Sequence, residues 1–424
     1  MRAPILLPSS PRDLLVDCFR AALAAVDARH CVAASLRDRP LTGDWHVVAV
    51  GKAAGAMALG ALDTLGERIA SGTVILPAGH LPPGFPSKRA ALRVLESAHP
   101  VPDRRSLDAG AALVDYVGQL PRQGQVLCFV SGGASSLVES LRTGLALEDL
   151  QRVNRWALGS GAPIGAVNAV RRRLSRLKGG GLAALLGERR AVALMISDVP
   201  GDDPRTIGSG LLHASADPDP LAPVAEGSLP GDIADIVRRA DAVRPAVTAL
   251  PRMPLRMVAT LRHACAAAAE TARSRGFEVK VGRRYAGDAA ELGSRFARQV
   301  ARTPAGTVCV WGGESTVRLP DRPGRGGRNQ HLALSAALAL ERSGDGWLLA
   351  AGTDGIDGAS DDAGAVVDAG TCRRGRDAGF DPHVSLAAAD SGSFLEASGD
   401  LLYTGATLTN VGDMVLGLRR GGHR

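Results

Sequence analysis

Lysine is scarce in this chain of 424 residues, where it supplies only four of the 50 basic side chains: Lys52, Lys88, Lys178 and Lys280. Arginine therefore carries nearly all of the positive charge. Two of the lysines, Lys52 and Lys178, adjoin glycine turns, where a compact, flexible ammonium group is not equivalent to a planar guanidinium group. These two turns are the first candidates for a functional site.

Cysteine and aromatic residues are also few. The six cysteines form no Cys-x-x-Cys pair, and their spacing predicts neither a disulfide framework nor a zinc site. Aromatic residues make up 3% of the chain, so nucleic-acid bases would find few side chains on which to stack. The formal net charge is +7, but the arginines are spread, and a positive surface also suits small polyanions such as nucleotides and carboxylates. We expect no nucleic-acid partner.

Long hydrophobic runs are absent too. The longest, such as residues 191–196 and 347–351, are far shorter than the ~18 residues that cross a bilayer. Residues 1–8 hold one charge and an apolar patch interrupted by prolines, which is too short for a secretory signal. We therefore expect a soluble, cytoplasmic protein that does not enter a membrane. Its length exceeds the ~250–300 residues of a single core, which predicts two domains.

Apolar segments typical of strands alternate with segments of helical periodicity along both halves of the chain. This alternation predicts an α/β fold with a parallel sheet that helices cover on both faces. Prolines and glycines become dense over residues 217–254, so we expect one domain over residues 1–250 and a smaller α/β domain over residues 251–424. The expected strands are residues 45–50, 73–76, 93–97, 125–130, 191–197, 278–281, 306–311 and 347–351, and the expected helices are residues 11–26, 106–119, 147–158, 166–177, 232–240, 261–275, 288–301 and 330–342.

Glycine turns follow several of these strands. In open α/β sheets the carboxyl ends of the strands form the ligand-binding edge, and glycine lets backbone N–H groups approach an anion closely. Because such turns occur in both halves, they favour a ligand-binding cleft between the two domains. The four turns are Gly51-Lys52, Ser131-Gly132-Gly133-Ala134-Ser135, Gly312-Gly313-Glu314-Ser315 and residues 352–358.

The first two turns have the composition of phosphate sites. An apolar strand runs directly into Gly51-Lys52 and then into a helix of small residues, so a helix N-terminus and a mobile charge coincide. Ser131–Ser135 combines N–H donors with two hydroxyl groups ahead of a helix, which suits a triphosphate or a carboxylate. The alternatives are a lysine that only solvates a helix start and a serine that only caps a helix.

Acidic residues follow two other strands. Asp198 comes directly after the expected strand at 191–197, a position that suits a Mg²⁺ ligand or a helix cap. Asp354, Asp357, Asp361 and Asp362 share one glycine-rich loop. One of them could accept a proton from a substrate hydroxyl, while the others solvate the loop or cap a helix.

Basic and polar side chains mark two further segments. Arg328 lies in a flexible basic stretch that opens a helix, and there it either reaches a transferring phosphoryl group or is solvated. Asn168, Arg172, Ser175 and Lys178 share one face of an expected helix, which is aimed at a ligand or at water. The chain has no Gly-x-x-x-x-Gly-Lys-[Ser/Thr] and no Gly-x-Gly-x-x-Gly after a strand, which argues against a nicotinamide dehydrogenase.

Taken together, these segments resemble the glycerate 2-kinase family, whose second half is called the MOFRL domain. The resemblance covers nearly the whole chain, and its motifs are numerous and in the family's order. They are Val50-Gly51-Lys52-Ala53-Ala54, Ser97-Ala98-His99-Pro100-Val101-Pro102-Asp103, Ser131-Gly132-Gly133, Asn168 with Arg172 to Gly180, Ser197-Asp198-Val199, Gly312-Gly313-Glu314-Ser315, Gly326-Gly327-Arg328-Asn329-Gln330, residues 352–358 and Thr409-Asn410-Val411.

The resemblance implies ATP- and Mg²⁺-dependent phosphorylation of D-glycerate at its 2-hydroxyl, in a cleft between a Rossmann-like nucleotide-binding domain and a MOFRL-type domain. It implies that Lys52 and Arg328 bind the negatively charged phosphate and substrate groups, and that the nucleotide lies along Ser131–Ser135. Asp198 and Asp354 are the candidates for metal ligand, and Asp354 also for base. The further binding candidates are Gly51, Ser131, Gly132, Gly133, Ala134, Ser135, Asn168, Lys178, Gly313, Glu314 and Asn329.

Two other functions stay open at this point. Members of the family have also been labelled hydroxypyruvate reductases, an activity that would oxidise NAD(P)H. A non-catalytic sensor that closes on a carboxylate or nucleotide would need only the glycine turns and a hinge. The expected partners are small molecules, D-glycerate and ATP, and the sequence leaves the oligomeric state open, a homo-oligomer included.

Overall fold

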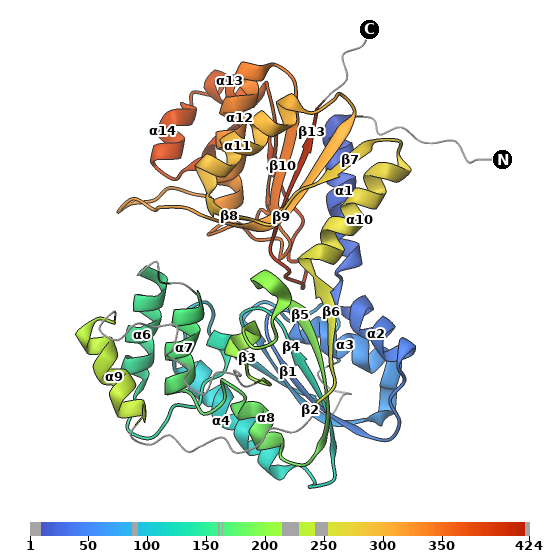
Figure 1. The fold of residues 1–424 in the computed structure, drawn as a ribbon, viewed down its shortest axis with the longest axis vertical. Coiled ribbons are helices and arrows are strands. Elements are labelled where there is room, and N and C mark those ends of the chain that lie inside the picture. The colour runs from blue at the N-terminus through green and yellow to red at the C-terminus, as the bar shows by residue number, and fades with distance from the viewer. Residues whose placement is uncertain are drawn as a thin grey trace, which may run out of the picture. The chain divides into compact units, whose positions relative to one another are not determined.

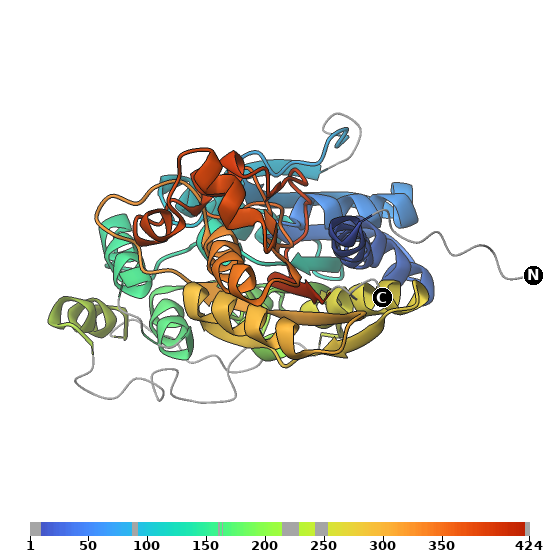
Figure 2. The same cartoon turned by 90° about the horizontal axis from the view of Figure 1, so that it is seen from above.

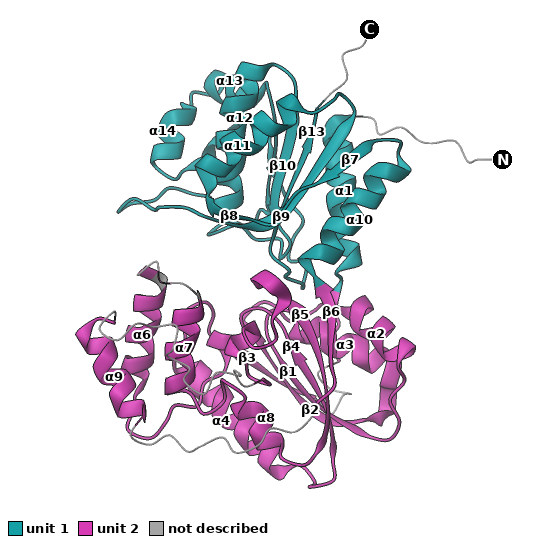
Figure 3. Cartoon of the chain, viewed as in Figure 1, with its two compact units in different colours: residues 1–27, 260–424 teal, residues 28–259 magenta. Residues whose placement is uncertain are grey.

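The computed structural model describes residues 10–86, 92–159, 162, 164–213, 229–241 and 253–419. The chain divides into two compact units (Figure 3). Residues 28–259 form one, which we call the parallel-sheet unit, and residues 1–27 with 260–424 form the other, the mixed-sheet unit. The expected boundary at residues 250 and 251 lies outside the described residues. The two units differ from the expected domains because the first helix belongs with the C-terminal half of the chain.

The parallel-sheet unit is built on a six-stranded sheet in the order β3-β2-β1-β4-β5-β6. All of its strands run parallel, which confirms the expected parallel sheet. The carboxyl ends of its strands therefore meet at one edge, where the Gly51 and Ser131 turns lie. The strands are β1 (Trp45–Val50), β2 (Ile69–Pro77), β3 (Leu92–Ser97), β4 (Gln125–Val130), β5 (Arg190–Ser197) and β6 (Leu255–Thr260).

Helices cover both faces of this sheet (Figure 1). On one face lie α2 (Ala28–Asp38) and α3 (Ala54–Leu65), which approach so closely that a Cβ atom on Gly60 would lie 2.3 Å from the Arg29 carbonyl oxygen. The other face carries α4 (Arg104–Gln119), α5 (Ala134–Leu137) and α8 (Gly181–Leu186), and their side chains pack on Val48, Val126 and Ala193. The burial of both faces explains why the strands are almost uniformly apolar.

A satellite core joins three more helices of this unit. It contains Val153, Val170, Leu174, Ile233, Ile236 and Val237, from α6 (Leu147–Gly159), α7 (Ile164–Leu174) and α9 (Gly231–Asp241). The helix expected to run to residue 177 is wrong at its C-terminal end, because Ser175 turns the chain. Its Oγ accepts the N–H groups of Leu177 and Lys178, each at 3.1 Å. A side chain that bonds nearby backbone groups in this way competes with the helix.

The mixed-sheet unit contains a seven-stranded sheet in the order β12-β11-β10-β13-β9-β7, with β8 paired to β9. Only β7 and β8 run parallel to β9, and the other neighbours are antiparallel. Because β13 runs between β9 and β10 in the opposite direction, it begins where they end. The strands are β7 (Glu278–Val281), β8 (Tyr285–Asp288), β9 (Thr307–Thr316), β10 (Trp347–Gly352), β11 (Gly364–Asp368), β12 (Leu401–Leu402) and β13 (Asp413–Leu418).

The expected turn at Gly312-Gly313-Glu314-Ser315 is wrong, because these residues lie inside β9. The two glycines are instead required by close packing on the two faces of the strand. A Cβ atom on Gly312 would lie 2.7 Å from Leu261, and one on Gly313 would lie 2.3 Å from the Tyr285 carbonyl oxygen. Strand packing and a tight turn both select glycine, so the pattern alone could not separate them.

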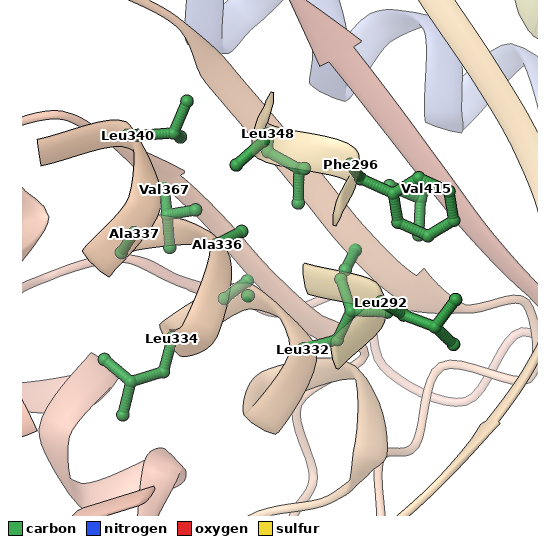
Figure 4. Packing of buried hydrophobic residues seen from close by; sticks show 14 of the residues in the cluster. Leu292, Phe296, Leu332, Leu334, Ala336, Ala337, Leu340, Leu348, Val367 and Val415 are labelled. Atoms are coloured by element: carbon green, nitrogen blue, oxygen red, sulfur yellow. The ribbon is translucent and has the colours of Figure 1, made fainter. Parts of the chain in front are cut away.

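Helices also cover both faces of the mixed sheet. Helices α11 (Ala289–Arg302) and α12 (Arg328–Ser343) pack side by side on one face, and α1 (Pro11–Ala25) and α10 (Leu261–Ser274) on the other (Figures 1 and 2). The first face forms a dense core around Phe296, Leu332 and Val415 (Figure 4). The shorter helices are α13 (Thr371–Asp377), α14 (Pro382–Ala387) and α15 (Ser391–Ala397).

The opening helix confirms its expected start. Ser10 is the N-cap of α1, its Oγ accepts the N–H of Asp13 at 3.1 Å, and Pro11 is the first helical residue. None of the described helices is long and apolar enough to cross a membrane.

Candidate active site

The expected glycine turns of the parallel-sheet unit are interlocked. Gly51 has a positive φ of 135°, and a Cβ atom there would lie 2.1 Å from the Ser131 hydroxyl. That hydroxyl accepts the N–H of Ala53 at 3.0 Å, and the Gly132 carbonyl accepts the N–H of Lys52 at 2.9 Å. Since these backbone donors are already used, contact with an anion at the first turn falls to the Lys52 side chain.

The second turn leaves donors available. No hydrogen bond within the described part of the chain uses the backbone N–H groups of Gly132 and Gly133. Gly133 has a positive φ of 81°, and a Cβ atom at this position would lie 2.8 Å from the His99 ring and 3.4 Å from Cγ of Lys52. Only glycine lets the imidazole approach this backbone so closely, and the Lys52 side chain lies at van der Waals distance from the same position.

A cavity of about 230 Å³ opens beside this turn. We call it the strand-end cavity. It is lined by six of the residues that the sequence singled out, which the fold brings together from four separate segments: Gly132, Gly133, Ser135, Asn168, Lys178 and Asp198. Further lining residues used below are His99, Glu139, Asn154, Arg171 and Ser209.

Lys178 is a member of a buried ion pair. Its side chain is 1% exposed, and its Nζ donates to Glu139, which is 2% exposed, and to the Val138 carbonyl at 3.3 Å. Burial lowers the pKa of Lys178, and the Glu139 carboxylate opposes this shift. This lysine is therefore a fixed, partnered charge in the cavity wall, in contrast to the mobile ammonium that the glycine turn suggested.

The polar residues expected on one helix face do not all point to the same site in the structure. Asn168 lines the cavity, whereas Arg172 donates from Nη2 to the Arg205 carbonyl at 2.7 Å, and Ser175 lies beyond the helix end. A neighbouring arginine that the sequence did not single out, Arg171, lines the cavity and donates to Asn154 Oδ1 at 3.0 Å.

The mixed-sheet unit holds a second cluster at the edge where β9 ends and β13 begins. The Arg328 guanidinium donates to Asp413 through Nε at 2.6 Å and Nη2 at 3.0 Å, and to Glu314 through Nη1 at 2.6 Å. We call these three residues the Arg328 cluster. Asp413 is 2% exposed, whereas the Glu314 side chain is 50% exposed. The arginine is thus held firmly on one side and by a solvent-exposed carboxylate on the other.

The charges of this cluster support one another. Burial raises the pKa of Asp413, and the Arg328 charge and its hydrogen bonds oppose that shift. Burial disfavours the charged form of Arg328, but the carboxylates of Asp413 and Glu314 more than compensate and raise its pKa. The guanidinium therefore stays charged, and its geometry is set by the buried Asp413.

The aspartates of the loop after β10 make different contacts. Asp357 is 2% exposed, and its carboxylate accepts the N–H groups of Asn329 at 3.0 Å and Gln330 at 2.8 Å, so it caps the start of α12. Asp362 pairs with Arg325 at 3.2 Å. Asp354 lies directly after β10, and its Oδ1 accepts the Ile356 N–H at 3.3 Å. A Cβ atom on Gly352 would lie 3.1 Å from Asp354 and 3.5 Å from Asp413, so both carboxylates face this glycine.

Within the described residues no group of three or more His, Cys, Asp or Glu side chains could hold a metal ion. The two expected metal ligands lie in different units: Asp198 lines the strand-end cavity of the parallel-sheet unit, and Asp354 lies in the mixed-sheet unit. Each is therefore considered as a separate candidate.

Two protein-family models match successive parts of the chain. A domain of unknown function, DUF4147, matches residues 14–227, and the MOFRL family matches residues 307–413. The chain is 39% identical over 420 residues to a "Putative hydroxypyruvate reductase" of Agrobacterium vitis, covering 96% of this chain and 94% of that protein. It is 34% identical over 429 residues to D-glycerate 2-kinase of Thermotoga maritima, covering 97% and 99%. A crystal structure of glycerate kinase from Thermotoga maritima matches with a TM-score of 0.84 at 32% identity, covering 97% of this chain and 100% of that one.

The chain belongs to the glycerate kinase family. The resemblance drawn from the motifs is thereby confirmed.

Several site residues of this family member escaped the sequence interpretation. Asp413 opens an otherwise apolar strand, and a lone acid at that position was the available signal. Glu139, which follows α5, and Asn154, which lies on α6, offered none, because single polar residues are ordinarily exposed. Ser209 stands between two glycines in a short 3₁₀ segment, which looked like an ordinary loop.

Asp357 should make the stability of this glycerate kinase family member depend on pH. Burial raises the pKa of Asp357 to about 7, and the N–H groups of Asn329 and Gln330 oppose this shift. A carboxyl group whose pKa is higher in the folded state than its ordinary 3.8 stabilises the fold at low pH. This contribution is lost as the pH rises through about 7, because the unfolded chain releases the proton first.

We therefore expect the free energy of unfolding of the wild type, relative to Asp357→Asn, to fall by about 3 kcal/mol between pH 4.5 and 8. Urea unfolding at a series of pH values measures this difference. Asp361→Asn, an exposed position on the same loop, serves as the control. A difference between wild type and Asp357→Asn that stays constant over this range would contradict the expectation.

Proposed function

We propose that this protein transfers the γ-phosphoryl group of ATP to the 2-hydroxyl of D-glycerate, giving 2-phosphoglycerate and ADP. The observation that carries the proposal is the strand-end cavity. Its N–H groups of Gly132 and Gly133 make no hydrogen bond to any described residue, and Lys52 lies beside them. The names of the relatives from Thermotoga maritima and Pyrococcus horikoshii, D-glycerate 2-kinase and glycerate 2-kinase, support this choice of reaction.

In this proposal the phosphate oxygens bind the N–H groups of Gly132 and Gly133, and the Lys52 ammonium neutralises part of their charge. Arg328 supplies a second cation to the transferring phosphoryl group. Phosphoryl transfer needs positioning and charge neutralisation more than covalent chemistry, which explains how it proceeds without a Walker pattern. The exposed side of the Arg328 guanidinium suits this role, because Asp413 fixes its other side.

A magnesium ion fits the residues of the strand-end cavity. Mg²⁺ commonly takes one or two carboxylates, with substrate phosphates and water completing its shell, so the single carboxylate of Asp198 is sufficient on the protein side. The ion would neutralise charge on the phosphates. Asp354 is the candidate to accept the proton of the 2-hydroxyl, since its carboxylate lies at the open end of β10 beside the Arg328 cluster.

The wild-type protein should release ADP when ATP, Mg²⁺ and D-glycerate are all present, and omission of any one should abolish the release. A pyruvate kinase and lactate dehydrogenase couple measures the rate, with L-glycerate as the stereochemical comparison. ³¹P spectra of the product distinguish 2-phosphoglycerate from 3-phosphoglycerate. Saturable glycerate binding without ADP release would instead favour the non-catalytic sensor.

The second candidate function is reduction of hydroxypyruvate, because the relative from Agrobacterium vitis carries that name. It requires a nicotinamide cofactor, and the first turn of the parallel sheet uses its backbone donors internally instead of presenting them to a dinucleotide. One absorbance trace at 340 nm with hydroxypyruvate and NADH or NADPH decides this point. Oxidation of the nicotinamide by a protein that releases no ADP in the coupled assay would overturn the kinase proposal.

A further inference from the structure

Ser209 adopts a backbone conformation that an L-amino acid with a side chain rarely adopts. Its φ is +58°, between Gly208 at +58° and Gly210 at +75°. The neighbouring backbone holds it there, because the Ser209 carbonyl accepts the N–H of Gly179 at 3.2 Å and the Gly210 carbonyl accepts that of Gly180 at 2.7 Å. A third glycine would relieve the strain, so the serine side chain must contribute something that glycine lacks.

The Ser209 hydroxyl is the centre of a hydrogen-bond chain in the wall of the strand-end cavity. It donates to Asn168 Oδ1 at 2.9 Å and lies 2.7 Å from the Ser135 hydroxyl. A hydroxyl group has one proton, and Asn168 Oδ1 can only accept. The Ser209 proton is therefore committed to Asn168, and Ser135 must donate its own proton to Ser209.

This order fixes what the cavity presents to a ligand. Once the Ser135 proton points at Ser209, the Ser135 oxygen can act only as an acceptor toward the cavity. With Oδ1 of Asn168 occupied, its amide NH₂ group is the remaining polar group, and it makes no hydrogen bond within the described residues. The Ser135 oxygen thus offers an acceptor and the Asn168 amide offers a donor. Both are oriented by the hydroxyl of Ser209, which is 1% exposed.

We propose that Ser209 is a positioning residue whose hydroxyl orients Ser135 to accept a hydrogen bond from a substrate hydroxyl and Asn168 to donate to a substrate carboxylate. The part of the strand-end cavity lined by Ser135 and Asn168 then binds the hydroxy acid, while phosphate binds at Gly132 and Gly133. A phosphate oxygen carries no proton to offer Ser135, so the ordered hydroxyl disfavours phosphate and favours an alcohol at that position.

The surrounding charges and space agree with this assignment. Arg171 and Lys178 contribute two cationic groups to the cavity lining. Glu139 pairs with Lys178 and Asp198 is the proposed Mg²⁺ ligand, so Arg171 is the cation left for a substrate carboxylate. A volume of about 230 Å³ is small for a whole nucleotide and suits a compact ligand such as a three-carbon acid. The inference rests on the proposed function for the identity of the hydroxy acid.

The test compares Ser209→Gly and Ser209→Ala in the full-length protein. Both variants remove the hydroxyl, but only glycine relieves the backbone, so Ser209→Gly should melt about 2–4 °C above Ser209→Ala. In both, KM for D-glycerate should rise about tenfold while KM for ATP changes less than twofold, because one ordered hydrogen-bond pair to an anionic substrate is lost. Ala389→Gly is the matched control, since Ala389 has a φ of +51° and lies in the mixed-sheet unit. It should melt slightly above the wild type with both KM values unchanged.

Calorimetric titration with D-glycerate, alone and with a non-hydrolysable ATP analogue, separates this inference from the proposed function. If the wild type binds glycerate and both variants bind it about tenfold more weakly, Ser209 has the assigned role even if no ADP forms. Unchanged glycerate affinity in Ser209→Gly, a rise in KM for ATP instead, or no glycerate binding to the wild type would each overturn the assignment.

Discussion

Replacing Lys52 by alanine should lower kcat/KM for ATP-dependent glycerate phosphorylation by about 10²–10³-fold. The side chain lies beside Gly133, which is in the lining of the strand-end cavity, and the backbone donors of its own turn are used by Ser131, Gly132 and Ile75. No other group of the first turn can replace the lost charge. Steady-state kinetics in the ADP-coupled assay measure the loss.

Lys280→Ala is the matched control for this variant, because Lys280 is an exposed lysine on β7 in the mixed-sheet unit. Its kinetics should equal those of the wild type. Lys52→Ala should keep the wild-type melting temperature within about 2 °C, since a partly exposed side chain at a turn contributes little to stability. Wild-type turnover in Lys52→Ala would remove this lysine from the mechanism.

Arg328→Lys should lower kcat/KM even more, by about 10³-fold, although the positive charge is kept. The planar fork of Arg328 bonds Asp413 through two nitrogens and still directs a third toward Glu314. An ammonium group cannot hold the buried carboxylate in this way and also reach a phosphoryl group. Because Asp413 is only 2% exposed and would lose its paired hydrogen bonds, we also expect a loss of stability of about 2–4 kcal/mol by urea unfolding.

Arg325→Lys offers a close comparison on the same segment. Arg325 is 40% exposed and also pairs with two carboxylates, Asp362 and Glu396, but neither belongs to the Arg328 cluster. We expect its activity to stay within twofold of the wild type. Equal losses in the two variants would show that the segment acts through its overall charge instead of through the Arg328 geometry.

The parallel half of this fold could be predicted closely from the sequence. Its central strands are buried on both faces, so β1 and β4 appear as mainly apolar runs, and their predicted ends match the structure to the residue. The mixed sheet was harder to predict. β13 begins with Asp413 and contains Gly417, which interrupt its apolar pattern, and β11 is only five residues long, so neither was readily identified as a strand.

Residues of the candidate site could be predicted where the residue type indicates a particular backbone geometry. Gly133 and Ser135 could be placed because a glycine turn after an apolar strand has few structural meanings. The roles of Lys178 and Asp357 could not be predicted, because burial decided them: one is neutralised by Glu139 and the other caps α12. Long-range pairing of this kind leaves no local pattern. The positive φ of Ser209 is a further signal, but only the structure shows it.

The mixed-sheet unit is assembled from both ends of the chain, with α1 contributed by the first 27 residues and β13 inserted between β9 and β10. During synthesis on the ribosome, the continuous segment 28–259 can fold before β13, the central strand of the mixed-sheet unit, has been made. The apolar face of α1 therefore has no partner from its own unit until some 230 further residues have been synthesised.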